Sequence, residues 1–445
     1  MIKARGIELD NLNYTNSTAL PARQPVRQQP QRPVPQSVHG RTPAAPKKKP
    51  KWSFGKSAAV KAQPAKEKKK LINWAMPQKF DFSFFLIVTI LMAFGLVMLF
   101  SATYASAKFA TDSHDSLYYI KRQLIFAALG FVGMIVISFI DYHVLQNKVI
   151  MRVAIVVSIG MMLFVKFAGK TTNGSERWLE IAGFTIQPSE ILKFTTILVI
   201  AAYMQKNYDR IGDFWHGFVP LMLRVGAACF LVVIQPHLSA TLIILTISVA
   251  MVFIGGARIP HVMLVLAGIA VAAFAVFEIF PKLGFDYVSD RMTGFLNPEA
   301  DVQKATYQTY QSLIAIGSGG WFGQGLGNSH QKYSYLPFVN NDFIFAIIVE
   351  ELGFAGALVV IVLFLILVIR GFYIAASAPD KFGMLLCSGI VIQIGVQALL
   401  NIAVVSNAFF NTGVSLPFIS YGGTALLMQL CEMGVVLNIS RKASI

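Results

Sequence analysis

Long apolar runs separated by short polar stretches dominate the chain from about residue 82 onward. A membrane-spanning helix needs roughly 20 predominantly apolar residues. About ten runs approach this length, and the fourth and sixth are short. The predicted spans are 82–103, 124–141, 149–168, 189–205, 217–234, 238–255, 261–280, 343–371, 383–406 and 413–438. The pattern therefore predicts an all-α polytopic membrane protein with about ten transmembrane helices.

Composition agrees with this class. The chain has 445 residues, of which 55% are hydrophobic and 13% charged, and its mean hydropathy is +0.59. A soluble protein of this size needs more polar surface. Residues 1–80 carry 17 Lys and Arg against three acids, whereas the rest of the chain is nearly balanced. The basic character thus belongs to the N-terminal segment, and a nucleic-acid-binding function has little support.

Residues 1–80 are rich in Pro, Gln and Lys, and they contain the basic runs 47–51 and 66–70. No apolar core typical of a signal peptide lies near the start. We expect a disordered cytoplasmic tail, because so polar a segment cannot bury enough apolar surface to fold. The basic runs either bind anionic lipid or a partner, or act only as a topology signal. The three cysteines lie in apolar segments without metal or disulfide spacing.

If the N-terminus lies in the cytoplasm, ten membrane crossings place the C-terminal residues 441–445 in the cytoplasm as well. The loops predicted outside carry about as many basic residues as those inside, against the usual inside excess. Basic residues on the outer side indicate an anionic substrate there, unless they pair with nearby acids. The outer ones include Lys121, Arg122, Lys170, Arg177, Lys282, Arg291, Lys304 and Lys332.

The longest predicted outer segment is 281–342, between the seventh and eighth helices. Its many aromatic residues are too apolar for a free coil, although some would serve only as interface anchors. The spacing within 302–317 predicts a helix lying on the membrane surface. The segment as a whole is predicted to be a large extracytoplasmic loop that packs back on the membrane domain.

The end of this loop is the first candidate site. Residues 321–352 change from glycine-rich and polar to apolar, with Asp342 at the edge and Glu350 and Glu351 inside the helix. Carboxylates at membrane depth are costly, so they indicate function or specific partners. Gly323, Gly325 and Gly327 permit left-handed backbone, and fit either close approach to a sugar or a plain turn.

A second polar cluster covers 170–193. Asn173-Gly174 predicts a turn, and Gln187-Pro188 precedes a helix that Ser189 or Glu190 could cap. Glu190 and Lys193 are three residues apart and share one helix face. They form either a structural ion pair or a face that handles phosphate charge. Arg177, next to Trp178, offers a guanidinium suited to pyrophosphate.

A third cluster, 411–424, leads into the last helix. Ser420, Tyr421 and the pair Gly422-Gly423 interrupt a helix at membrane depth. Such backbone either lines a cavity or allows close helix packing. Gln393, Gln397 and Asn401 form a polar stripe on the preceding helix, which could contact a partner or line an internal cavity.

Four strings together make the chain recognisable: QPSEILK at 187–193, GQGLGNS at 323–329, NDFIFAIIVEELG at 341–353 and LPFISYGG at 416–423. The chain resembles the SEDS family, the group of FtsW, RodA and SpoVE, over about residues 81–440. The strings are more similar to the FtsW branch or its sporulation relative than to RodA. One departure is His237, where many members carry an acid, so no role of that acid is transferred.

The resemblance implies a peptidoglycan glycosyltransferase that polymerises lipid II on the outer face of the bacterial cytoplasmic membrane. It implies Asp342 as the catalytic acid, acting as general base. Arg177, Lys193 and Lys332 are candidates for stabilising the leaving pyrophosphate. The remaining predicted substrate-binding residues are Trp178, Glu190, Ser420 and Gly422. A divalent cation, Mg²⁺ or Mn²⁺, could share this work, although no metal-ligand cluster is visible. One of Glu350 and Glu351 is expected to face the bundle interior as a structural or cavity residue, and neither is expected to take part in the chemistry.

The resemblance also implies a class B penicillin-binding protein transpeptidase as partner, with other divisome membrane proteins, and a place at the division septum. Three alternatives remain open. The protein could be a lipid II flippase, a RodA- or SpoVE-type polymerase of elongation or sporulation, or a non-enzymatic scaffold that works through its basic tail.

Overall fold

The computed structural model describes residues 81–110, 115–168, 170–172, 175–181, 184–235, 237–278, 294–299, 306–333, 335–337 and 339–443. The basic segment 1–80 lies outside the described residues, so its predicted disorder and cytoplasmic place stay predictions. Parts of the long loop 281–342 also lie outside them. All described residues belong to one compact unit.

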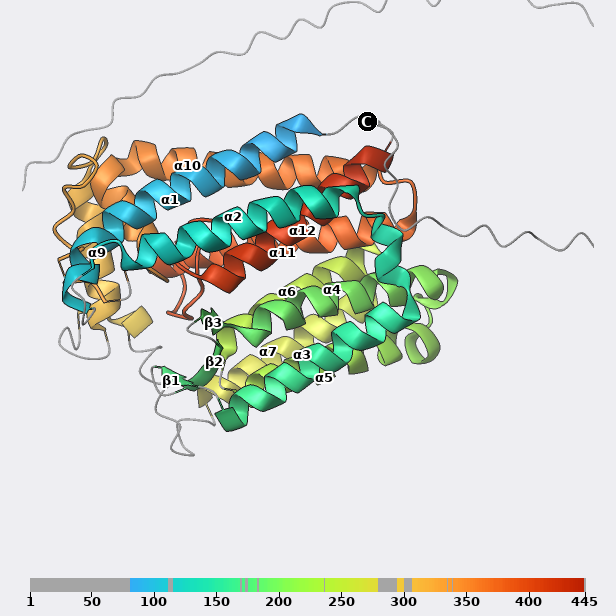
Figure 1. The fold of residues 1–445 in the computed structure, drawn as a ribbon. Coiled ribbons are helices and arrows are strands. Elements are labelled where there is room, and N and C mark those ends of the chain that lie inside the picture. Colours follow the sequence, from blue (N-terminus) through green and yellow to red (C-terminus); the bar gives the residue numbers. More distant parts are fainter. Residues whose placement is uncertain are drawn as a thin grey trace, which may run out of the picture. The chain divides into compact units, whose positions relative to one another are not determined.

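Long helices make up most of the described chain (Figure 1). A helix occurs at each of the ten predicted positions. They are α1 (Phe82–Ala110), α2 (Tyr118–Phe139), α3 (Lys148–Ala168), α4 (Pro188–Lys206), α5 (Val219–Val233), α6 (Leu238–Ile254), α7 (Ile259–Glu278), α10 (Ile344–Ala376), α11 (Lys381–Val405) and α12 (Gly423–Lys442). Short helical turns η1 (Tyr142–Gln146), η2 (Tyr208–Arg210) and η3 (Phe214–Phe218) join some of them.

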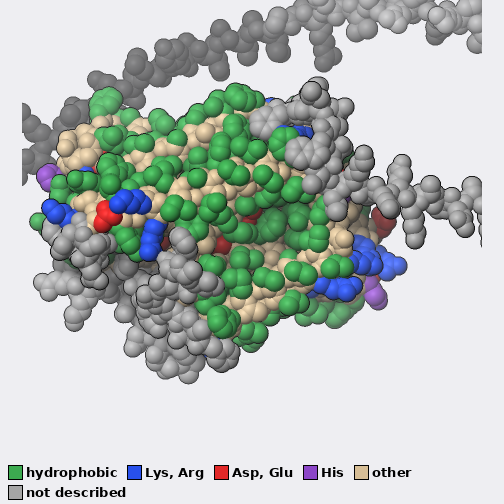
Figure 2. Space-filling model, viewed as in Figure 1, with side chains coloured by type: hydrophobic (Ala, Val, Ile, Leu, Met, Phe, Trp, Pro, Cys, Tyr) green, Lys and Arg blue, Asp and Glu red, His purple; other side chains and the backbone are tan. Residues whose placement is uncertain are grey.

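Seven described helices are long and apolar enough to cross a membrane. They are α1, α2, α3, α5 with η3, α10, α11 and α12. The apolar parts of α6 and α7 are shorter, and α4 carries Glu190, Lys193 and Lys206. Apolar side chains cover much of the visible surface (Figure 2). Exposed apolar residues of this kind suit contact with lipid, and the all-α membrane class is confirmed.

A small antiparallel sheet between α3 and α4 was not predicted. It consists of β1 (Lys170–Thr172), β2 (Ser175–Ile181) and β3 (Phe184–Ile186), in the order β1-β2-β3. The predicted Asn173-Gly174 turn lies outside the described residues, but Thr172 and Ser175 on either side of it are paired. The predicted capping of α4 is wrong: Gln187 is the N-cap, and its side chain makes no capping hydrogen bond.

The helices form two neighbouring groups (Figure 1). One group contains α1, α2, α10, α11 and α12, and the other contains α3 to α7, with α11 packed against α4 and α6. Glycines let α2 and α12 approach closely, because a Cβ at Gly130 would lie 2.7 Å from a Leu430 methyl carbon and one at Gly434 2.6 Å from the Met134 carbonyl oxygen. The deepest helices, α11 and α12, carry the buried polar groups described below.

The long loop returns to the membrane domain as expected. Its helix α9 (Tyr307–Gly319) lies close to the predicted 302–317. α9 packs along α10, however, and does not lie only on a surface. Ala315 is fully buried there, and a Cβ at Gly319 would lie 2.0 Å from the Val349 carbonyl oxygen. The loop is therefore part of the packed structure near the start of α10.

The glycines after α9 form a turn that inserts beside a break in α10. Gly353 interrupts that helix with a φ of 70°, and Gly323, Gly325 and Gly327 all have positive φ. The backbone N–H of Gln324 donates to the Glu350 carbonyl at 3.0 Å, and that of Gly325 to the Glu351 carbonyl at 2.9 Å. A Cβ at Gly323 would collide with this backbone. Of the two interpretations of these glycines, the turn is the one the structure supports.

Candidate active site

One cavity gathers most of the predicted site residues. It lies where α4, α6, α10 and α12 begin, next to the segment 413–422. Its lining residues are Trp178, Gln187, Glu190, Lys193, His237, Ser239, Ala240, Ile243, Asn341, Asp342, Gln397, Gly413, Val414, Ser415, Tyr421, Gly422 and Ala425. Trp178, Glu190, Lys193, Asp342 and Gly422 were predicted from sequence, and they come from four separate segments. The cavity volume is about 50 Å³.

Asp342 forms one wall of the cavity, two residues before α10 begins. Its backbone carbonyl accepts a 2.7 Å hydrogen bond from Asn401 Nδ2, and the same amide group donates to the Val414 carbonyl at 2.6 Å. Asn401 therefore ties the start of α10 to the opposite wall. A Cβ at Gly413 would lie 3.3 Å from Asp342 Oδ2. The carboxylate thus sits close against the glycine of the facing segment.

Glu190 and Lys193 form an ion pair inside the cavity. Lys193 Nζ lies 2.8 Å from Glu190 Oε2, and both side chains are almost fully buried. The ammonium also donates to Gln397 Oε1 at 2.9 Å, and Gln397 Nε2 donates to the Ser415 carbonyl at 3.1 Å. The sequence suggested either a structural ion pair or a helix face that handles phosphate charge. The two interpretations are compatible, because the pair is buried in the structure and also lines the cavity. Burial in a low dielectric strengthens the field of such groups.

Four helix N-termini converge on this cavity. Gln187, His237 and Gly422 are the N-caps of α4, α6 and α12, and Asp342 lies one residue before Phe343, the N-cap of α10. None of these four N-caps makes a side-chain capping hydrogen bond. Each helix N-terminus carries roughly half a positive charge, and its free N–H groups favour anions. The arrangement provides positive potential opposite the Asp342 carboxylate.

Several lining residues were missed by the sequence analysis. Asn341 precedes Asp342, and its Oδ1 is buried without a hydrogen-bond partner among the described residues. Such an acceptor suits a hydroxyl or amide N–H of a ligand, since an unmet buried acceptor is costly. Ser239 Oγ donates to the Thr412 carbonyl at 2.6 Å and so joins α6 to the facing segment. The sequence signal that could have found Asn341 is its position next to Asp342, which the sequence analysis did single out.

Two predicted site residues, Ser420 and Lys332, do not line the cavity, and a third, Arg177, has a side chain that the structure does not describe. Ser420 Oγ donates to the Asn341 carbonyl at 2.6 Å and accepts from the Leu416 N–H at 2.8 Å, so it holds the cavity wall in place. Lys332 lies at Glu351, as described below. The backbone of Arg177 is in β2, but its side chain lies outside what the structure describes. Substrate binding by these three residues stays a prediction.

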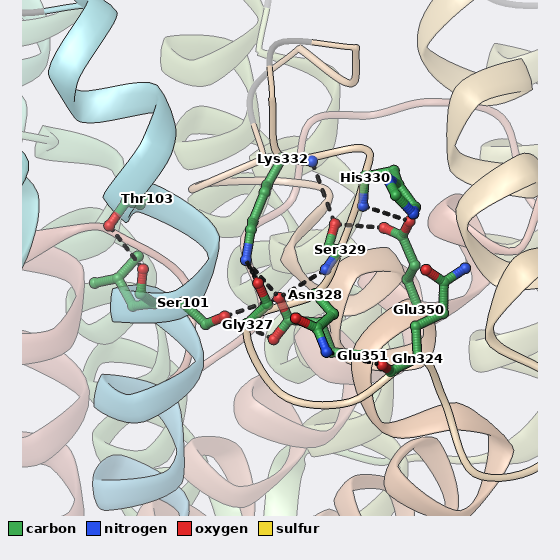
Figure 3. Close-up of polar contacts among 11 residues, drawn as sticks. Ser101, Thr103, Gln324, Gly327, Asn328, Ser329, His330, Lys332, Glu350 and Glu351 are labelled. Atoms are coloured by element: carbon green, nitrogen blue, oxygen red, sulfur yellow. Dashed lines mark hydrogen bonds and ion pairs between the residues drawn. The ribbon is translucent and has the colours of Figure 1, made fainter.

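Glu350 and Glu351 anchor the glycine-rich loop (Figure 3). Glu351 is fully buried; it accepts hydrogen bonds from Ser101 Oγ at 2.8 and 2.6 Å, and Lys332 Nζ lies 3.1 Å from its Oε1. Glu350 accepts from the His330 N–H at 2.9 Å and from Ser329 Oγ. The network connects α1, α10 and the loop. Both acids face the interior of the bundle, whereas this was expected for only one of them.

The polar stripe on α11 faces inward. Gln393, Gln397 and Asn401 are all buried, and Gln393 Nε2 donates to the buried Glu432 of α12 at 2.9 Å. Gln397 bonds to Lys193 and Ser415, and Asn401 bonds to Asp342 and Val414, and all four of these partners line the cavity. The internal interpretation of the stripe is therefore correct, and the partner-contact interpretation is wrong.

No group of three or more His, Cys, Asp or Glu side chains able to hold a metal occurs among the described residues. Among the described residues, Glu190 is the one acid besides Asp342 that lines the cavity, and it is paired with Lys193. This donor set does not fit a dedicated Mg²⁺ or Mn²⁺ site, which needs several oxygen ligands. A divalent cation stays a prediction, and no step below depends on one.

Comparison with known proteins identifies the family. The model of the cell cycle protein family of FtsW, RodA and SpoVE matches residues 81–445. The chain belongs to this family. A probable peptidoglycan glycosyltransferase FtsW of Geobacter sp. (strain M18) is 36% identical over 363 residues, covering 82% of this chain and 97% of the relative. The stage V sporulation protein E of Bacillus subtilis (strain 168) is 38% identical over 362 residues, covering 81% and 97%.

Solved structures share the fold. A chain from a structure described as a peptidoglycan synthase complex that coordinates polymerization and crosslinking aligns with a TM-score of 0.66 and 23% identity, covering 81% of this chain and 98% of that one. The rod shape determining protein RodA of Thermus thermophilus aligns with a TM-score of 0.59 and 24% identity, covering 84% and 99%. The family therefore keeps this helical architecture at low sequence identity.

Proposed function

We propose that this protein is a peptidoglycan glycosyltransferase that polymerises lipid II. The observation that carries the proposal is the cavity that Asp342 lines together with the buried ammonium of Lys193 and the N-termini of α4, α6 and α12. A carboxylate opposite positive potential suits a reaction in which a proton is taken from one group while an anion leaves another. The names of the FtsW relatives support the same activity.

In the proposed reaction, the 4-hydroxyl of the GlcNAc of one lipid II attacks the anomeric carbon of the MurNAc at the end of the growing chain. The new C1–O4 bond forms as the C1–O bond to pyrophosphate breaks, and its electron pair leaves with undecaprenyl pyrophosphate. Asp342 accepts the proton of the attacking hydroxyl. Attack opposite the leaving group inverts the α-linkage to a β-1,4 bond. A positioned general base typically contributes about 10²–10⁴-fold to the rate.

The leaving pyrophosphate gains negative charge as the bond breaks. Lys193 and the uncapped N–H groups of α4, α6 and α12 are the groups that would stabilise it. Because these groups are fixed by packing, they need no reorganisation during the reaction. The cavity of about 50 Å³ is smaller than a disaccharide and is open to the outside. We therefore propose that the sugars bind at its mouth, and that only the reacting atoms enter.

We further propose that the cavity opens on the outer face of the membrane. The helices α4, α6, α10 and α12 begin at the cavity and end at the opposite side of the bundle. The opposite ends carry Lys206, Arg258, Lys381 and Lys442. Basic residues concentrate on the cytoplasmic side of membrane proteins, which supports the outer location of Asp342.

A class B penicillin-binding protein is the proposed partner, and cell division the proposed setting. The first is supported by the fold shared with a chain of a peptidoglycan synthase complex. The second is supported by the FtsW relative, whereas the similarity to a sporulation protein supports a SpoVE-type role as the alternative. Depletion of the chain in its own cells decides between them: filaments that fail to divide indicate division, and normal division with defective spores indicates sporulation.

The activity is tested with purified full-length protein, alone and with the co-purified transpeptidase. Labelled lipid II is supplied in proteoliposomes, and glycan strands are separated on a gel. The proposal predicts strands in the sample with the partner. Movement of lipid II between leaflets without strands would favour the flippase alternative. If neither occurs and deletion of residues 1–75 abolishes division while Asp342→Asn does not, the scaffold alternative is correct.

A further inference from the structure

A second, larger cavity lies between α3, α4 and α5. It shares no lining residue with the active-site cavity, and its volume is about 570 Å³, within the range of roughly 300–1,000 Å³ typical of ligand pockets. Its lining residues are Gln146, Lys148, Met151, Ile155, Ser158, Ile159, Leu192, Thr195, Thr196, Val199, Ile200, Ala202, Tyr203, Gln205, Lys206, Arg224, Val225, Ala227, Ala228 and Leu231. We call it the α3–α5 groove.

The groove is apolar along its length and basic at one end. Leu192 to Lys206 spans about 20 Å of α4 at 1.5 Å per residue, more than the roughly 15 Å of one leaflet's hydrocarbon. Ser158 and Thr195, the polar residues inside, bond to each other at 2.7 Å. The hydroxyl of Thr196 donates to the Leu192 carbonyl. These groups are satisfied internally, so the long part of the groove suits an alkyl chain.

The basic end is formed by Lys148, Lys206 and Arg224, and no acidic residue lines the groove. All three side chains belong to exposed residues, and no ion pair links Lys148 or Lys206 to a described acid. Arg224 stacks over the Tyr203 ring at 4.6 Å, which fixes its guanidinium at the rim. Gln146 adds a buried Nε2 that donates to no described acceptor. The rim thus offers three cations and an unused donor to a negatively charged oxygen group.

We propose that the α3–α5 groove binds an anionic phospholipid, with an acyl chain along α4 and the phosphate at the basic rim. Charge decides between this and other occupants. The chain's own segment 1–80 has the same sign of charge as the rim and is excluded as a match. A polyprenyl substrate whose pyrophosphate lies at Asp342 would leave the rim unoccupied, because Lys206 lies about 20 Å along α4 from Lys193.

The site is tested by native mass spectrometry of the full-length protein in detergent. The probes are a palmitoyl-oleoyl phosphatidylglycerol and a phosphatidylcholine with the same chains. We expect one phosphatidylglycerol to bind preferentially. The double variant Lys206→Gln/Arg224→Gln should weaken its binding by on the order of 20-fold, since each membrane-facing cation contributes about fivefold. Arg258→Gln, an exposed cation near the same end of the bundle but outside the groove, is the control and should change nothing.

A second variant, Ala202→Phe, fills the groove and should reduce the binding of both lipids. Equal binding of the two lipids to wild type would overturn the proposal, as would full retention of phosphatidylglycerol by Ala202→Phe. Displacement of the phosphatidylglycerol by one equivalent of undecaprenyl phosphate, abolished by Ala202→Phe, would instead assign the groove to the substrate's chain and would also overturn it.

Discussion

Lys193 Nζ lies 2.8 Å from Glu190 Oε2 inside the candidate active-site cavity, with only 2% and 7% of the two side chains exposed. A buried ion pair is often no more stabilising than an apolar pair, but removing one partner leaves an uncompensated charge and costs about 3–5 kcal/mol. The pair can therefore be a structural element and a binding element at once. The two roles are separable by substitution.

Lys193→Met should lower the thermal midpoint of unfolding strongly, because Glu190 loses its counter-ion. The double variant Glu190→Gln/Lys193→Met should recover most of that loss. It should nevertheless stay inactive in lipid II polymerisation, since the ammonium proposed to stabilise the leaving pyrophosphate is gone. Recovery of both stability and activity in the double variant would mean that the pair is structural only.

Gly95 allows the segment 416–422 to lie against α1. A Cβ at Gly95 would be 2.5 Å from the Phe418 carbonyl oxygen and 2.7 Å from the Ile419 Cα. Gly95→Ala should therefore displace the wall that carries Tyr421 and Gly422, and reduce polymerisation at least tenfold. Gly160→Ala, on α3 with no atom near its Cβ position, is the matched control. It should be neutral or slightly stabilising, because alanine favours helix. Equal activity of the two variants would contradict this packing.

Glu351 should hold the glycine-rich loop through its charge. Glu351→Gln leaves Lys332 buried without a counter-ion, and we expect a loss of about 3–5 kcal/mol. Limited proteolysis of the loop 319–332 should accelerate accordingly. Asn328→Ala removes only an exposed hydrogen bond to the Gln324 carbonyl and serves as control. Unchanged cleavage of Glu351→Gln would show that the network does not fix the loop.

Sequence patterns predicted the helices well, because membrane helices follow apolar runs of fixed length. They also predicted that Asp342, Glu190 and Lys193 bear on the site, since charge at membrane depth is costly and rarely without purpose. The patterns missed the sheet β1-β2-β3, whose strands are too short for a clear alternation. They did not predict that Lys332 pairs with Glu351, 19 residues further along the chain.

The convergence of four helix N-termini could not be predicted from sequence. The starts of α4, α6 and α10 are visible by themselves, near Gln187, His237 and Asp342, whereas α12 begins at Gly423 and was predicted from residue 413. The meeting of the four helix starts depends on how the helices pack. The role of Asn401 could not be predicted from sequence either. The stripe of amides to which it belongs was apparent, but only the packed structure shows that Asn401 Nδ2 bridges the carbonyls of Asp342 and Val414.

The end of the bundle opposite the cavity provides a pH test. Lys442 Nζ lies 2.6 Å from Asp141 Oδ1. Although burial raises the pKa of Asp141, the hydrogen bonds from Lys442 and from the His143 backbone N–H and ring outweigh it and lower the pKa from 3.8 to about 2. This contribution to stability is complete above the unfolded pKa of 3.8 and is lost as the pH falls toward 2.

The midpoint of thermal unfolding should therefore decrease as the pH falls from about 4 to 2. The decrease should be smaller in Lys442→Gln, which lacks the ammonium that pairs with Asp141. Lys381→Gln is the control, since Lys381 Nζ lies over the Tyr208 ring instead of a carboxylate. Identical pH profiles of wild type and Lys442→Gln would contradict the assigned pairing.

The role of Asp342 as general base is tested most directly by Asp342→Asn in the lipid II polymerisation assay with the partner present. The matched control is Asp213→Asn, which removes an exposed acid that is paired with His216 and does not line the cavity. We expect Asp213→Asn to polymerise like wild type, and Asp342→Asn to keep its thermal midpoint but lose about 10²–10⁴-fold in rate. Folded Asp342→Asn that forms strands at the wild-type rate would contradict the mechanism.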